Sequence, residues 1–103
     1  MSRAKRTDAN QKRVVEHLRR SGLSVAITSS LGNGFPDLVV AGWGNMAFAG
    51  KKYYSNKTVL VELKDGSKPP SAQKLTDAEI KFMDTWKGEY IKATTAEEIL
   101  KLF

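Results

Sequence analysis

The chain has 103 residues, of which 41% are hydrophobic and 27% charged, and its formal net charge is +6. These values predict one globular domain with a modest core, and they exclude an intrinsically disordered chain. The absence of cysteine excludes disulfides, thiol catalysis and cysteine-based zinc sites. With a single histidine, His17, any metal chemistry must depend on carboxylates.

A basic N-terminal arm, residues 1–9, precedes the first predicted helix. Thr7 or Asp8 is a suitable N-cap for this helix, and the Ser-Gly pair at 21–22 is a typical stop. Its apolar residues share one face at helical spacing: Val14, Val15 and Leu18. The sequence therefore predicts an amphipathic helix that packs on the core through this face.

Three strands are predicted next, at residues 23–30, 37–42 and 57–64, because each stretch is rich in β-branched and aliphatic residues. The segment between the second and third strands, residues 42–57, is punctuated by glycines, and we interpret it as a loop or an irregular hairpin. After the third strand, residues 65–71 contain paired prolines and a glycine, which indicates a turn or a mobile loop.

The C-terminal part is predicted to add a helix, a strand and a short helix. Thr76 opens the first of these helices, which extends to about Lys87, and Glu79 can complete a capping box with Thr76. A fourth strand follows at residues 89–94, and Thr95 caps the final helix.

The order αβββαβα predicts the fold class. It indicates a single α/β domain over residues 1–103, with a small mixed sheet flanked by helices and a short C-terminal helix. No apolar run approaches the ~20 residues of a membrane helix, and the N-terminus lacks the apolar region of a signal peptide. We therefore expect an intracellular, cytoplasmic protein.

Charged residues stand at unusual places in the apolar strands. Asp37 directly follows a proline where the second strand begins, and Glu62 and Lys64 fall within the third. Side chains alternate along a strand, so Glu62 and Lys64 point to the same face. One interpretation is structural: Glu62 and Lys64 form a pair at a frayed strand end, and Asp37 is a turn carboxylate after the proline. The other is a divalent cation, because burying an uncompensated carboxylate is costly.

Mg²⁺ fits the second interpretation because it prefers oxygen ligands and is typically held by one or two carboxylates with water and substrate phosphate. Asp37 and Glu62, on neighbouring strands, would supply two carboxylates. The carbonyl of Leu63 could supply a third oxygen, and Lys64 could orient or activate an attacking water.

Residues 34–37 (GFPD) and 61–64 (VELK) together resemble the Pro-Asp…Glu-x-Lys signature of the restriction-endonuclease-like, or PD-(D/E)xK, phosphodiesterases, whose core has the same αβββαβ order. Within that superfamily the chain is most similar to the small stand-alone VRR-Nuc proteins of phage and bacteria, whose module also occurs in the Fanconi-associated nuclease. The similarity covers residues 10–103. It implies a Mg²⁺- or Mn²⁺-dependent endodeoxyribonuclease that cuts branched DNA such as Holliday junctions, and a phage-encoded member would act in the host cell.

The resemblance also implies roles for individual residues. Asp37 and Glu62 would bind the metal, Lys64 would assist catalysis, and Glu16 on the first helix would contribute directly or through water. A solvated helix residue is a nearly equal alternative for Glu16. The family usually has glutamine in the helix after the E-x-K strand, whereas this chain has Glu79 there, for which we favour a capping role. Gln73 would substitute only if that helix began earlier.

The basic residues predict a polyanion as the partner. Residues 1–74 hold 13 Lys/Arg against 5 Asp/Glu, an asymmetry typical of a nucleic-acid-binding face. The proposed contacts would hold phosphates without reading sequence; they are Lys12, Arg13, Arg19, Lys51, Lys52 and Lys68. Aromatic residues accompany the lysines of residues 42–57, and core or subunit packing is favoured over base stacking for most of them.

Two coordinated cuts in a four-way junction require two active sites, so we expect a homodimer. The apolar residues of segment 42–57, together with Leu102 and Phe103, are the candidate interface. The alternative function is a catalytically inactive nucleic-acid-binding domain on the same fold, and a basic scaffold is a third possibility. The complete set of Asp37, Glu62 and Lys64 argues against both.

Overall fold

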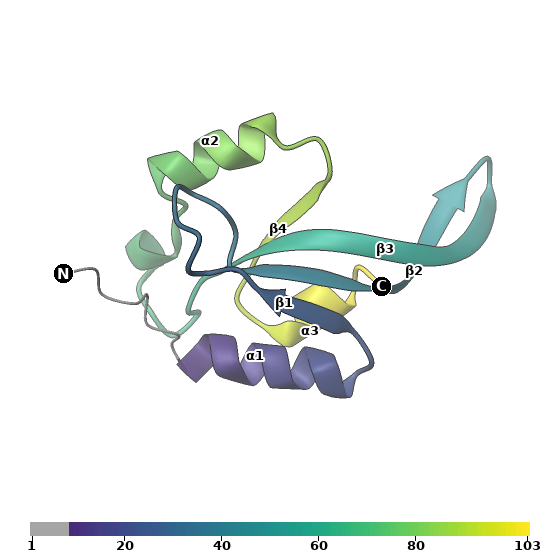
Figure 1. Cartoon of the computed structure of the whole chain (residues 1–103), viewed down its shortest axis with the longest axis horizontal. Helices are drawn as coiled ribbons and strands as arrows, with labels where there is room; N and C mark the ends of the chain where they lie inside the picture. The colour runs from purple at the N-terminus through teal and green to yellow at the C-terminus, as the bar shows by residue number, and fades with distance from the viewer. Residues whose placement is uncertain (1–8) are drawn as a thin grey trace.

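A computed structural model describes residues 9–103, apart from the side chains of Ala9 and residues 45–48. The elements are α1 (Ala9–Arg20), β1 (Ser24–Ile27), β2 (Leu38–Phe48), β3 (Lys51–Leu63), the 3-10 helix η1 (Pro70–Gln73), α2 (Asp77–Thr85), β4 (Glu89–Ala93) and α3 (Ala96–Leu100). The expected α/β class and the order αβββαβα are confirmed (Figure 1). The predicted N-caps Thr7 and Asp8, with the rest of the arm up to residue 8, lie outside the described residues, and Ala9 begins α1.

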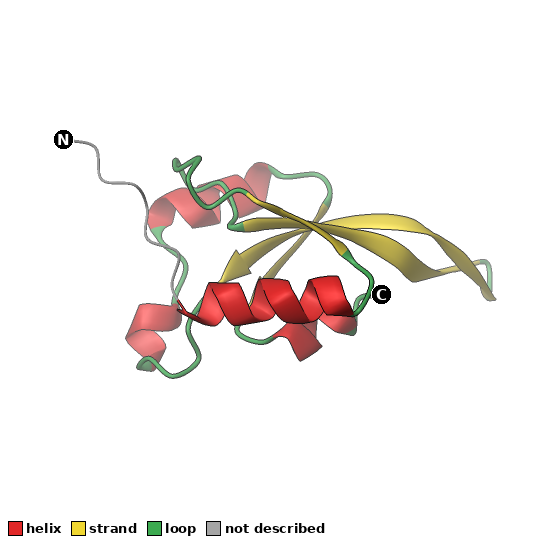
Figure 2. Ribbon diagram, turned by 60° about the horizontal axis from the view of Figure 1, so that its bottom comes forward, coloured by secondary structure: helices red, strands yellow, loops and turns green. Residues whose placement is uncertain are grey.

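The four strands form one mixed sheet in the order β1-β2-β3-β4. β2 is antiparallel to both β1 and β3, and β4 runs parallel to β3. Figure 2 shows the sheet between two helical layers, with α1 and α3 on one side and α2 on the other. Within the residues described, no helix is long and apolar enough to cross a membrane.

The two faces of the sheet differ in burial and charge. One face, called the core face, carries Val40, Val59 and Val61, which pack with apolar residues of α1 and α3. The other, called the α2 face, carries Leu60 and Glu62, because side chains alternate along β3. The apolar stripe predicted for the first helix does face the core: Val14, Val15 and Leu18 are all buried there.

Of the two interpretations of residues 42–57, the loop is wrong and the hairpin is confirmed, although the hairpin is regular and not irregular. β2 and β3 pair without interruption from Leu38↔Val61 to Phe48↔Lys51, and the hairpin extends beyond the rest of the sheet (Figure 1). Two glycines serve close packing instead of a turn. A Cβ on Gly42 would lie 2.3 Å from Leu23 Cδ2, and a Cβ on Gly44 would lie 2.8 Å from Lys57 Cδ.

The caps predicted in the C-terminal part are present. Thr76 and Glu79 form a reciprocal capping box at the start of α2, and the Thr95 side chain accepts a hydrogen bond from Glu98 N at the start of α3. α2 ends at Thr85, two residues before the predicted Lys87, because the backbone at Trp86 is extended and closes the helix.

Candidate functional site

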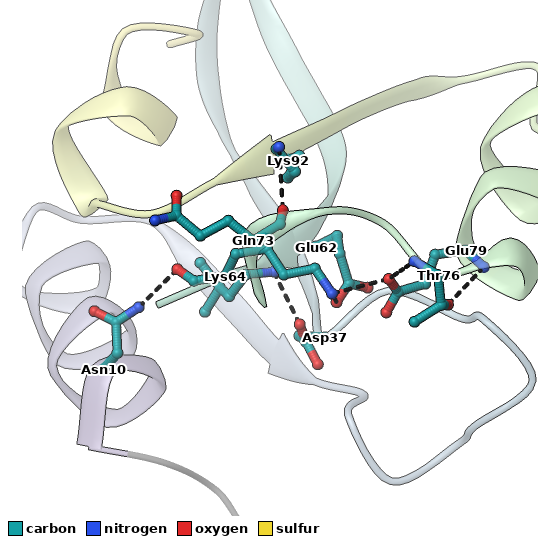
Figure 3. Close-up of polar contacts among 9 residues, drawn as sticks. Asn10, Asp37, Glu62, Lys64, Gln73, Thr76, Glu79 and Lys92 are labelled. Atoms are coloured by element: carbon teal, nitrogen blue, oxygen red, sulfur yellow. Dashed lines mark hydrogen bonds and ion pairs between the residues drawn. The ribbon is translucent and has the colours of Figure 1, made fainter. Parts of the chain in front are cut away.

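The acidic residues singled out in the sequence meet where β2 begins and β3 ends. The pairing of Leu38 with Val61 places Asp37 beside the end of β3, where its Oδ2 accepts a hydrogen bond from Leu63 N at 2.8 Å (Figure 3). Asp37 and Glu62 are 7% and 3% exposed. The structure therefore brings the two carboxylates together in a buried place.

Glu62 is a buried carboxyl in unfavourable electrostatic surroundings. Its pKa is raised from 4.5 to about 9, chiefly by burial and in addition by the nearby carboxylates of Asp37 and Glu79. Its Oε1 is buried without a hydrogen-bond partner among the described residues. Its Oε2 lies 3.8 Å from Lys64 Nζ, at the outer limit of an ion pair. The surrounding protein therefore compensates a charged Glu62 poorly.

Lys64 is held by α2 through Glu79. The Nζ of Lys64 donates to Glu79 Oε1 at 2.9 Å, and the same oxygen accepts a hydrogen bond from Thr76 N at 2.8 Å (Figure 3). Burial raises the pKa of Glu79, but these two hydrogen bonds outweigh it and hold the pKa below its ordinary value. Glu79 therefore caps its helix, as we favoured, and in addition binds Lys64.

Tyr90 forms part of this site although sequence reasoning did not single it out. β4 pairs with β3 so that Tyr90 stands beside Leu60 and faces α2, where its ring contacts that of Phe82 at 6.2 Å between centroids. The pKa of Tyr90 is raised to about 12, chiefly by burial and in addition by the negative charges of Glu62, Glu79 and Asp37. Its hydroxyl is buried and has no hydrogen-bond partner in the described structure. The only sequence signal was the alternation of the fourth strand.

Glu16 lies elsewhere on the molecule. It is exposed on α1, where it lines a shallow cavity that also includes Arg19 and Ile27. α1 packs against the core face, whereas Glu62 points to the α2 face. The structure therefore does not place Glu16 in the cluster of Asp37, Glu62, Lys64 and Glu79, and it favours the interpretation of Glu16 as a solvated helix residue.

Gln73 organises the turn after β3. It ends η1, and its Nε2 donates to the carbonyls of Lys68 at 2.7 Å and Gly66 at 3.4 Å. Its own carbonyl accepts a hydrogen bond from Lys92 Nζ at 3.2 Å (Figure 3). Because α2 begins only at Asp77, Gln73 does not take the helical position that the family gives to glutamine.

The basic residues proposed to contact DNA are exposed, and they lie in three places. They are Lys12, Arg13 and Arg19 on α1, Lys51 and Lys52 at the end of the hairpin, and Lys68 in the turn after β3. Arg19 also anchors the start of the sheet, because its Nη2 donates to Val25 O at 3.0 Å. The start of α1 reaches the acidic cluster at the end of β3, because Asn10 Nδ2 donates to Lys64 O at 3.1 Å (Figure 3).

The carboxylates of this site are compatible with a divalent cation. Among residues 9–103, no group of three or more His, Cys, Asp or Glu side chains is arranged to hold a metal ion. Two carboxylates are nevertheless sufficient for Mg²⁺, which completes its shell with water and substrate phosphate. The buried, unpartnered Oε1 of Glu62 beside Asp37 fits such a cation, because a positive charge there would relieve an otherwise costly arrangement.

Comparisons with known proteins give no match from which a function could be transferred. No protein-family model matches the chain, and no curated protein or solved structure matches it. A function for this chain must therefore be inferred from the motif residues and from the geometry in which they meet.

Proposed function

We propose that this protein is a divalent-metal-dependent endodeoxyribonuclease of the VRR-Nuc type, which hydrolyses phosphodiester bonds in branched DNA. One observation carries the proposal: Glu62 is buried beside Asp37 with one carboxylate oxygen unpartnered among the described residues. An arrangement of this kind lowers stability unless something neutralises it, and catalytic sites are where such perturbed groups gather.

Each residue of the cluster has a proposed role. Asp37 and Glu62 would hold Mg²⁺ or Mn²⁺, with the carbonyl of Leu63 as a third oxygen ligand. The bound cation would stabilise negative charge on the phosphate and acidify water. Lys64 would orient the attacking water, and its ammonium is restrained for this task by Glu79 at 2.9 Å.

The proposed partners are DNA and a second copy of the chain. The net charge of +6 supports a polyanionic partner. A homodimer would supply the two cuts that resolution of a junction needs. Leu102 and Phe103 pack against the core of their own chain, so they add little to an interface. Sedimentation at micromolar concentration, without DNA, tests this point: a dimer is expected, and a monomer alone would contradict it.

Cleavage of labelled linear, flap and four-way DNA tests the activity. We expect cutting of branched DNA with Mg²⁺ or Mn²⁺ and none with EDTA, and we expect Glu62→Gln to bind DNA without cutting it. If no substrate is cut with either metal but DNA is still bound, the protein is instead an inactive nucleic-acid-binding domain on this fold. If DNA is neither bound nor cut, both functions are wrong.

A further inference from the structure

The β2–β3 hairpin has two faces, and its register assigns each exposed aromatic residue to one of them. Opposite residues of an antiparallel pair share a face, and successive residues alternate. Trp43 stands opposite Asn56, and Tyr54 lies two residues from Asn56 along β3, so Trp43 and Tyr54 share a face. Tyr53 points to the other side. Continued along β3 with the same alternation, the face of Trp43 and Tyr54 is the α2 face, which carries Glu62.

The residues on this part of the α2 face are open to solvent. Trp43 is 62% exposed and Tyr54 61%. We call this set the aromatic stripe; its members are Lys52, Tyr54, Asn56, Thr58 and Trp43, all of them exposed. At about 3.4 Å per residue, Asn56 lies roughly 20 Å and Tyr54 roughly 27 Å along the strand from Glu62. The stripe therefore lies on the continuation, along the hairpin, of the strand face that carries Glu62.

The charge of the hairpin complements a polyanion. The 24 residues between Asp37 and Glu62 include three lysines and no Asp, Glu or Arg, so this segment carries a formal charge of +3. Lys52 lies on the stripe itself. Exposed aromatic rings between cations are the arrangement that binds single-stranded nucleic acid, because unpaired bases stack on the rings while the cations attract phosphates.

We propose that the aromatic stripe binds an unpaired nucleic-acid strand that extends from the acidic site toward the hairpin end. This inference rests on the proposed function, because the strand that would bind the stripe is the part of the same DNA substrate that flanks the cleavage site. An unpaired strand is required because bases in an intact duplex are stacked on one another and unavailable to Trp43 and Tyr54. The roughly 20–27 Å along β3 between Glu62 and the aromatic rings corresponds to about six to eight stacked nucleotides at ~3.4 Å each.

Binding in EDTA tests the proposal without cleavage. The probes share one duplex, which either ends bluntly or carries a single-stranded tail. The tail is about ten or about two nucleotides long, and it extends from either a 5′ or a 3′ end. We expect the long tail of one polarity to strengthen binding. Trp43→Ala and Tyr54→Ala should each weaken that tail-dependent binding by about five- to a hundredfold, the range for loss of one base-stacking contact. Tyr53→Ala, from the opposite face of the same strand, is the matched control and should leave it unchanged.

Fluorescence supplies a second readout. In a Trp86→Phe background Trp43 is the remaining tryptophan, and its emission should be quenched by the long-tailed duplex but not by the blunt one. Equal weakening by Tyr53→Ala, or no effect of Trp43→Ala and Tyr54→Ala, would overturn the stripe. A third result would also overturn it: the two variants sediment as monomers while the wild type sediments as a dimer, and their tail binding is intact. The stripe would then be a contact between two copies of the chain. The nuclease proposal is tested separately, because only the absence of metal-dependent cutting of DNA would contradict it.

Discussion

Lys64 Nζ and Glu79 Oε1 lie 2.9 Å apart, and this ion pair joins the chain just after β3 to the capping box of α2. The same carboxylate oxygen accepts the backbone N–H of Thr76, so the start of the helix and the lysine depend on one group. The position of Lys64 beside Glu62 is therefore coupled to the integrity of the first turn of α2.

Replacing Glu79 separates capping from charge. Glutamine at this position can still complete the capping box and accept a hydrogen bond from Lys64, so Glu79→Gln should cost at most about 1 kcal/mol of stability. Glu79→Ala loses both interactions and should cost roughly 1–2 kcal/mol. Thermal or urea unfolding of the two variants measures the difference. Equal losses would mean that the oxygen shared by Thr76 and Lys64 contributes little.

Replacing Glu62 by Gln should stabilise the metal-free protein at pH 8. The pKa of Glu62 is raised from 4.5 to about 9 in the folded state, so between these values the unfolded chain has released a proton that the folded chain retains. Stability therefore falls as pH rises across this range, and removal of the acid should restore on the order of 1–3 kcal/mol at pH 8 and little at pH 4. Melting curves at both pH values test this. A variant that is less stable than the wild type at pH 8 would make Glu62 a structural acid.

Lys64→Met should separate metal binding from reaction rate. The proposed role of Lys64 concerns the attacking water and not the cation, so we expect Mg²⁺ to raise the melting temperature of this variant and that of the wild type by the same amount. Cleavage should slow by about a hundredfold or more, the range for loss of a group that assists proton transfer. The measurements are melts with and without Mg²⁺ and single-turnover cleavage. Loss of the Mg²⁺-induced shift would instead place Lys64 among the groups that organise the cation site.

Glu98 should make the start of α3 sensitive to acid. Its Oε1 accepts hydrogen bonds from the Thr94 hydroxyl at 2.7 Å and from Thr94 N at 3.1 Å, and these lower its pKa. A lowered pKa contributes stability above the unfolded value near pH 4.5, and that contribution disappears as pH falls through the folded value. Glu98→Gln should therefore lose under about 1 kcal/mol at pH 7, and this loss should shrink as pH falls below 4.5. Glu97→Gln, which removes the same charge from the same helix end, is the control.

The local parts of the fold were predictable because their causes lie within a few residues. Thr76 with Glu79, and Thr95 before α3, satisfy backbone N–H groups of their own helices, so the sequence pattern contains the whole interaction. The meeting of Asp37 with Glu62, which are 25 residues apart, was predicted on a different basis, namely that the two acids stand on neighbouring strands.

The remaining features depend on partners that are distant in sequence. In the sequence, Gly42 and Gly44 resemble turn residues, and only the packing of Leu23 and Lys57 shows why glycine is needed there. The full length of the hairpin was therefore not predicted. Lys64 and Glu79 are 15 residues apart on different elements, so their ion pair follows only from how α2 docks. The position of Glu16 likewise depends on which face of the sheet α1 covers, and a helical pattern alone does not specify this.

The uninterrupted register of the hairpin imposes a parity rule on changes in its length. Removing one opposed pair of residues would shorten the hairpin by about 3.4 Å and turn every side chain beyond the deletion to the opposite face. Removing two opposed pairs would shorten it by about 7 Å and keep each side chain on its own face. Insertions and deletions that preserve what the hairpin presents beside Glu62 must therefore occur in steps of two residues per strand.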